Sequence, residues 1–149
     1  MQTPATNPSA GMKPTSDEAS VRLRHWFPGT LEAVAQAREW VNEVAVSTGH
    51  APLAPTVELL VSELATNAVR YAEGNRFSVE FNADGLLLVA VCDSNVVAPV
   101  PRRATSNEEG GRGLAIVAAL SDRWGAEVHH TGKCVWFQLA DRGEAKATD

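Results

Sequence analysis

A strong signal for an antiparallel β-hairpin in the middle of the chain limits the folds open to this protein. Residues 77–81 alternate between apolar and polar side chains, as a strand with one buried face does. Asp84-Gly85 is a dipeptide typical of two-residue hairpin turns. The near-continuous apolar run over residues 86–92 then predicts a strand buried in the centre of a sheet.

Periodic patterns on either side of this hairpin predict the other elements. They indicate a strand over residues 21–27, helices over 31–47, 55–72 and 114–120, and a last hairpin formed by 126–130 and 134–140, with Gly132 in its turn. Thr30 is expected to cap the first helix, Leu31 to begin its apolar stripe, and Gly49 to close it in a left-handed conformation. Hairpins outnumber β-α-β units here. We therefore expect an α+β fold, a two-layer sandwich whose mixed, mostly antiparallel sheet carries three main helices on one face.

Length and composition indicate one globular domain. The 149 residues are 44% hydrophobic and carry a net charge of −5, which argues against nucleic acid or an anionic membrane as the main partner. Residues 1–20 and 142–149 lack apolar periodicity, so we expect a disordered N-terminal tail, a domain over 21–141 and a flexible C-terminal tail.

The two cysteines, Cys92 and Cys134, each lie in an apolar run and belong to no C-x-x-C pair. We expect them to be two buried free thiols, which fits a reducing compartment. The chain has no apolar stretch long enough to span a bilayer, and its first residues do not form a signal peptide. These observations predict a cytoplasmic protein.

Three polar residues on the second predicted helix form the first candidate site. Glu63, Asn67 and Arg70 are spaced i, i+4 and i+7, which places them on one face, away from the apolar stripe. An amide oxygen is a suitable ligand for Mg²⁺, and a nearby carboxylate can act as a general base. A solvated helix face with weak side-chain pairs would explain the same spacing.

Two further segments carry candidate binding residues. Asp93 ends the central strand and could accept a hydrogen bond from an exocyclic amine, although an Asx turn would use the same residue type. Gly110-Gly111-Arg112-Gly113 precedes the third predicted helix, where free backbone N–H groups attract phosphate. A flexible turn before a helix would also explain these glycines.

The order and spacing of the three segments resemble the GHKL ATPases, which include DNA gyrase and the histidine kinases. Residues 63–72 resemble the family's N-box, 91–95 its second motif and 110–114 its third. The segments 122–125 and 132–137 are similar to the branch of the anti-sigma factor serine kinases and the short actinobacterial ATP-binding proteins. The resemblance extends over nearly all of residues 21–139.

This resemblance implies a Bergerat-type ATP-binding fold and a role for each matching residue. Asn67 would hold Mg²⁺, Glu63 would be the general base and Asp93 would bind the adenine amine of ATP. The remaining cofactor-binding residues implied by the motifs are Arg70, Asn95, Gly110, Gly111, Arg112, Gly113 and Leu114.

The implied partners are proteins. In this branch a serine of an anti-sigma factor antagonist receives the phosphate, and the kinase also binds a sigma factor. A homodimer is compatible with the resemblance. Direct contact with nucleic acid or a membrane is not expected.

The second motif departs from the family pattern Asp-x-Gly-x-Gly, because Asp93 is followed by Ser94-Asn95-Val96-Val97 without a glycine. In addition, Cys134 stands where the family's last strand has a threonine near the adenine. Two functions from different classes therefore stay open, a Mg-ATP-dependent serine kinase and a non-catalytic ATP-binding anti-sigma or scaffold module. A plain α+β interaction domain without nucleotide is a third reading.

Overall fold

A computed structural model describes residues 21–71, 75–84, 86–94 and 109–140 of the chain. The elements in these ranges are β1 (Val21–Phe27), α2 (Leu31–Ser47), the 3-10 helix η1 (Ala51–Leu53), α3 (Ala54–Tyr71), β2 (Phe77–Asp84), β3 (Leu86–Asp93), α4 (Glu109–Leu120), β4 (Arg123–His129) and β5 (Gly132–Ala140). The predicted tails, the second residue of the hairpin turn and Asn95 lie outside the described residues. None of the described helices is long and apolar enough to cross a membrane.

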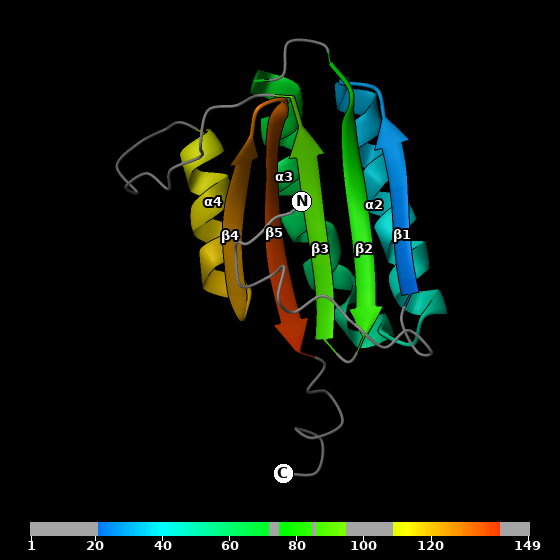
Figure 1. Cartoon of the computed structure of the whole chain (residues 1–149). Helices are drawn as coiled ribbons and strands as arrows, with labels where there is room; N and C mark the ends of the chain where they lie inside the picture. Colours follow the sequence, from blue (N-terminus) through cyan, green and yellow to red (C-terminus); the bar gives the residue numbers. More distant parts are fainter. Residues whose placement is uncertain (1–20, 72–74, 85, 95–108, 141–149) are drawn as a thin grey trace.

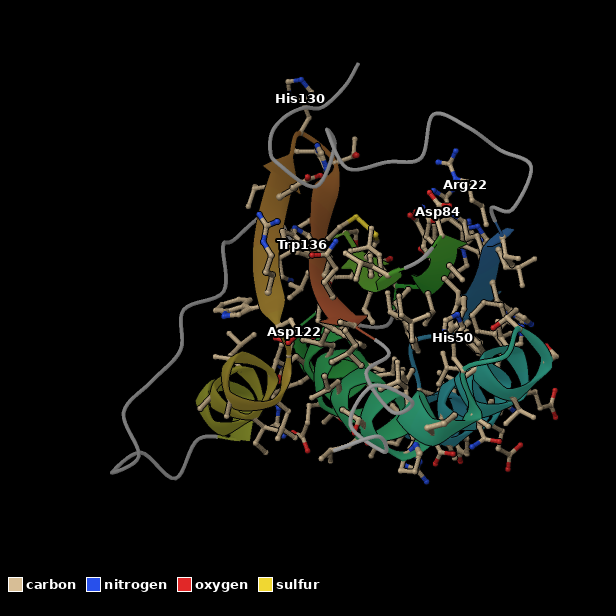
Figure 2. The ribbon with its side chains drawn as sticks, turned by 90° about the horizontal axis from the view of Figure 1, so that it is seen from below. Arg22, His50, Asp84, Asp122, His130 and Trp136 are labelled. Carbon is tan, nitrogen blue, oxygen red and sulfur yellow. A yellow bond between two sulfur atoms is a disulfide. The ribbon has the colours of Figure 1, made fainter. Side chains whose placement is uncertain are left out.

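The described strands form one five-stranded sheet in the order β1-β2-β3-β5-β4. All four pairings are antiparallel, and β3 lies in the centre, as its continuous apolar run predicts. The helices α2, α3 and α4 lie together on one face of the sheet (Figures 1 and 2). The predicted two-layer α+β sandwich is therefore confirmed.

The hydrophobic core fills the space between the sheet and the helices. Phe77 and Phe81 of β2 and Phe137 of β5 contribute large side chains and are at most 1% exposed. Burial of each such side chain stabilises the fold by roughly 1.5–3 kcal/mol. Leu31 departs from the predicted stripe of α2, because it is 68% exposed and the buried face of α2 begins at Ala33. The Leu31 side chain therefore lies outside the contact between α2 and its neighbours, which the periodicity of the sequence does not show.

The ends of α2 follow from local sequence. The Thr30 side chain accepts a hydrogen bond from the Ala33 backbone N–H at 3.2 Å, the N-cap that was predicted. Gly49 has φ +89°, a left-handed conformation that an L side chain rarely adopts, and it ends the helix as expected.

The glycines before the third predicted helix lie inside that helix. We expected a turn over residues 110–113 and a helix from Leu114, but α4 already begins at Glu109. The cost of glycine in a helix applies to the helix interior, whereas Gly110 and Gly111 lie in the first turn of α4.

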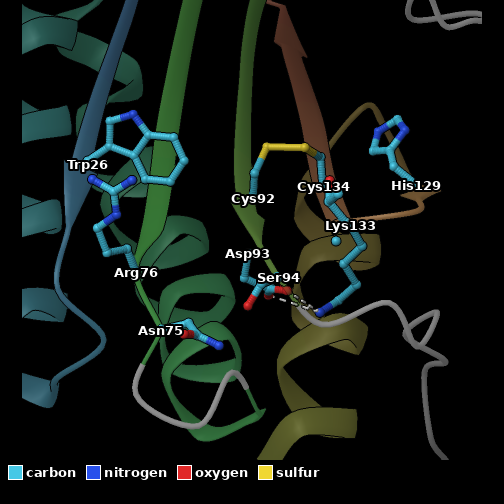
Figure 3. A pocket seen from close by; sticks show the side chains of 11 residues that line it. Trp26, Asn75, Arg76, Cys92, Asp93, Ser94, His129, Lys133 and Cys134 are labelled. Atoms are coloured by element: carbon cyan, nitrogen blue, oxygen red, sulfur yellow. Dashed lines mark hydrogen bonds and ion pairs between the residues drawn. A yellow bond between two sulfur atoms is a disulfide. The ribbon is translucent and has the colours of Figure 1, made fainter.

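The two cysteines form a disulfide, contrary to the expected pair of free thiols. Cys92 on β3 and Cys134 on β5 lie directly opposite each other, with their Cα atoms 4.0 Å apart (Figure 3). The residues are 42 positions apart in the sequence, so only the pairing of β3 with β5 brings them together. The argument from free thiols to a reducing compartment therefore no longer holds.

Candidate functional site

The polar face of α3 lies against the beginning of α4. A Cβ atom built on Gly113 would lie 2.9 Å from Glu63 Oε1 and 3.7 Å from Asn67 Nδ2. The backbone of α4 therefore approaches both side chains so closely that a larger residue at position 113 would displace the Glu63 carboxylate. Glu63 and Asn67 are each half-buried, which is unlike a freely solvated helix face. The structure thus brings together two of the three segments that the sequence singled out.

The other predicted site residues on α3 and α4 do not take part in this close contact. Arg70 lies on the same face of α3, one turn further along, and is exposed. Leu114 is 3% exposed and belongs to the hydrophobic core, so only its backbone could contact a ligand. Gly110, Gly111 and Arg112 form the first turn of α4, and the Arg112 side chain lies outside the described part of the structure.

The third segment ends at a buried ion pair. Asp93, the last residue of β3, pairs in register with Lys133 on β5. Lys133 Nζ lies 2.9 Å from Oδ2 and 3.1 Å from Oδ1 of Asp93, and both contacts are drawn in Figure 3. The side chains are 8% and 4% exposed. Burial of a charged group is tolerated when a partner compensates it, which is the arrangement observed here.

Alternation along the strands places this ion pair and the disulfide on opposite faces of the sheet. Asp93 and Lys133 share the face of Val91 and Val135, which lie in the core under the helices. Cys134 therefore faces away from that side. The residue on the Asp93 side of this strand is its neighbour Lys133. That Cys134 takes the place of the family's threonine stays a prediction.

A pocket of about 450 Å³ opens beside the ion pair (Figure 3). Asp93, Ser94 and Lys133 form part of its wall. On the opposite side the Arg76 guanidinium lies over the Trp26 ring, 4.4 Å from its centroid, in a cation–π contact. The volume lies within the usual range for a small-molecule site.

The pocket and the α3–α4 contact lie at the same end of the molecule. Figure 1 shows that α3 ends and α4 begins at the edge of the sheet where β3 ends. The lining of the pocket includes neither Glu63 nor Asn67. It includes Trp26, Cys92 and Cys134, whose side chains alternate with core residues, so most of the pocket lies on the sheet face away from the helices.

The residues in this region fit a phosphate-bearing ligand. The first turn of α4 presents backbone N–H groups, and Gly113 lets a polar helix face approach them closely. Among the described residues, no group of three or more His, Cys, Asp or Glu side chains could hold a metal ion by itself. A Mg²⁺ ion at Asn67 would therefore need phosphate and water oxygens as its other ligands, a coordination that Mg²⁺ commonly has.

Lys133 is the residue of this region that sequence reasoning missed. It lies in a segment whose pattern is similar to the family, but nothing in its local sequence points to Asp93, 40 positions earlier. Only the register of β3 with β5 shows the pairing.

Comparison with known proteins agrees with this geometry. Residues 27–139 match the family model of the histidine kinase-like ATPase domain. Among solved structures, the chain is similar to the RsbU and RsbW domains of Rv1364c from Mycobacterium tuberculosis, with 18% identity and a TM-score of 0.59. That match covers 80% of this chain and 32% of the M. tuberculosis chain, so it supports the fold. No curated protein matches the chain. Because the family model covers most of the sequence, the chain belongs to the histidine kinase-like ATPase domain family.

Proposed function

We propose that this protein binds Mg-ATP at the α3–α4 contact and acts as a protein-serine kinase that phosphorylates an anti-sigma factor antagonist. The observation that carries the proposal is the close approach of Gly113 to both Glu63 and Asn67. In this proposal the general base, the amide ligand for Mg²⁺ and the helix start that would bind phosphate lie together at this contact. Membership of an ATPase family supports the ATP part of the proposal.

Each matching residue has a role in this proposal. The Asn67 amide oxygen would hold Mg²⁺, and backbone groups of Gly110, Gly111 and Gly113 would bind phosphate oxygens. Asp93 would accept a hydrogen bond from the adenine amine. We place Arg70, Asn95, Arg112 and the Leu114 backbone among the cofactor-binding residues on the strength of the motifs alone.

Catalysis in this proposal depends on Glu63. Bound Mg-ATP supplies the phosphoryl group and the cation that balances its charge. The Glu63 carboxylate would accept the proton of the attacking serine hydroxyl, which raises the nucleophilicity of that oxygen. Its half-buried position against α4 limits its motion, as a general base requires.

The partners follow from the family branch and not from a contact in the structure. The resemblance to the anti-sigma factor serine kinases and the likeness to an RsbW domain support an antagonist protein as substrate. We also propose that a sigma factor binds the same protein, that the protein forms a homodimer and that it works in the cytoplasm. The net charge of −5 argues against direct binding to nucleic acid.

The proposal is tested by ATP titration followed by phosphoryl transfer. Calorimetry should show that Mg-ATP binds to the pure protein. ATP labelled at its γ-phosphate should label a serine of an antagonist whose gene lies near that of this protein, or of an antagonist that is captured with it. The matched control is Glu63→Gln, which keeps the size of the side chain and removes the base. This variant should bind ATP and lose transfer. Tight ATP binding without transfer to any candidate antagonist would refute the kinase assignment.

The altered second motif favours a second candidate, a non-catalytic ATP-binding anti-sigma or scaffold module. The family pattern Asp-x-Gly-x-Gly is replaced here by Asp93-Ser94-Asn95-Val96-Val97, which lacks both glycines. Glu63→Ala separates the two candidates. A variant that regulates its partner as well as wild type would assign the protein to this second class.

A further inference from the structure

Lys133 forms an ion pair with the residue that we propose to bind the adenine amine. Its ammonium group is 2.9 Å and 3.1 Å from the two carboxylate oxygens of Asp93. Both side chains are more than nine-tenths buried, and both lie on the sheet face that the helices cover. The residue that would bind the adenine amine therefore has a charged neighbour on the same face of the sheet.

The backbone around this pair is closely fitted. A Cβ atom on Gly132 would lie 2.0 Å from the Asp93 carbonyl oxygen, which is far inside van der Waals contact. The start of β5 therefore packs against the end of β3 as only a glycine allows. The next residue, Lys133, is paired with Asp93 in the strand register.

The pair combines an acceptor and a donor at neighbouring positions. An ionised carboxylate only accepts hydrogen bonds, whereas a lysine ammonium has three N–H donors. Two of these donors point to Asp93. An acceptor oxygen next to a donor nitrogen is also the pattern with which the amide of Asn or Gln recognises adenine. Asp93 and Lys133 reproduce that pattern with two side chains.

We propose that Lys133 is a specificity-determining residue that donates a hydrogen bond to ring nitrogen N1 of adenine while Asp93 accepts one from the exocyclic amine. The inference rests on the proposed ATP function. Adenine presents an amine donor beside the N1 acceptor, which matches the pair in order. A 6-oxopurine presents an acceptor beside an N1–H donor, so in the same pose both contacts would be repulsive.

A comparison of two nucleotides with two proteins tests this assignment. Dissociation constants are measured for ATP and for 1-deaza-ATP, in which a C–H group replaces N1, with wild type and with Lys133→Met. In wild type we expect 1-deaza-ATP to bind at least about tenfold more weakly, as loss of one hydrogen bond from a charged donor predicts. In Lys133→Met this difference between the nucleotides should disappear. 7-Deaza-ATP keeps N1 and the amine and is the matched control. Its dissociation constants for wild type and for Lys133→Met should differ by no larger factor than those of ATP.

The outcomes separate this inference from the proposed function. If wild type binds ATP and 1-deaza-ATP equally well, or if the difference persists in Lys133→Met, Lys133 only supports Asp93 and the inference is overturned while ATP binding stands. If wild type binds neither nucleotide, the proposed function fails and the inference fails with it. Lys133→Met leaves a buried carboxylate without its ammonium partner and could misfold. The double variant Asp93→Asn, Lys133→Met removes both charges, and it too should bind ATP and 1-deaza-ATP alike.

Discussion

Loss of the disulfide between Cys92 and Cys134 is expected to destabilise the protein by about 4 kcal/mol. The bond closes a loop between residues 42 positions apart, and the chain-entropy relation gives about 4 kcal/mol for a loop of that length at 25 °C. Both cysteines are only half-buried, so their replacement leaves no large cavity to add to this figure. For a chain of this size the loss corresponds to a fall in Tm of about 8–16 °C.

Thermal unfolding followed by circular dichroism measures this effect. The Tm of wild type and that of the double variant Cys92→Ala, Cys134→Ala are each measured with and without dithiothreitol. The reductant should lower the Tm of wild type toward that of the double variant and leave the double variant unchanged. Alkylation and mass spectrometry report the state of the thiols in each sample. Two free thiols in wild type purified without reductant, or an unchanged Tm after complete reduction, would refute the reasoning.

Three further substitutions test the site and the sheet. Gly113→Ala should leave the free energy of unfolding within about 1 kcal/mol of wild type, because alanine favours a helix. It should nevertheless weaken Mg-ATP binding in calorimetry, since the new Cβ displaces Glu63. Gly125→Ala brings a Cβ within 2.7 Å of the Trp136 ring and should cost about 1–3 kcal/mol in urea unfolding; an unchanged midpoint would contradict this contact. Asn67→Ala should keep the fold and lower the affinity for Mg-ATP, and an unchanged affinity would rule out its Mg²⁺ role.

Local sequence determined most of the secondary structure of this protein. The alternation over residues 21–27, the Thr30 cap and the left-handed Gly49 predict β1 and α2 with the bounds that the structure shows. These features depend on interactions between residues a few positions apart, so a short segment contains the information that decides them. The extended start of α4 is an exception. There the packing of Gly113 against α3 outweighs the low helix propensity of glycine.

Spacing on a single helix was also enough to place Glu63 and Asn67 on one face. Whether that face contacts a ligand site or solvent depends on which element packs next to it. That element is α4, whose Gly113 lies about 50 residues further along the chain. The motifs thus identified the participants of the candidate site, and their order along the chain indicated the family.

Tertiary structure alone decided the two contacts at the ends of β3 and β5. The disulfide Cys92–Cys134 and the ion pair Asp93–Lys133 are successive rungs of one strand pairing, on opposite faces of the sheet. Each joins residues about 40 positions apart. A shift of that register by one residue would turn the side chains of one strand to the opposite face and break both contacts. Register depends on how the whole sheet packs against its helices, which no local pattern in the sequence specifies.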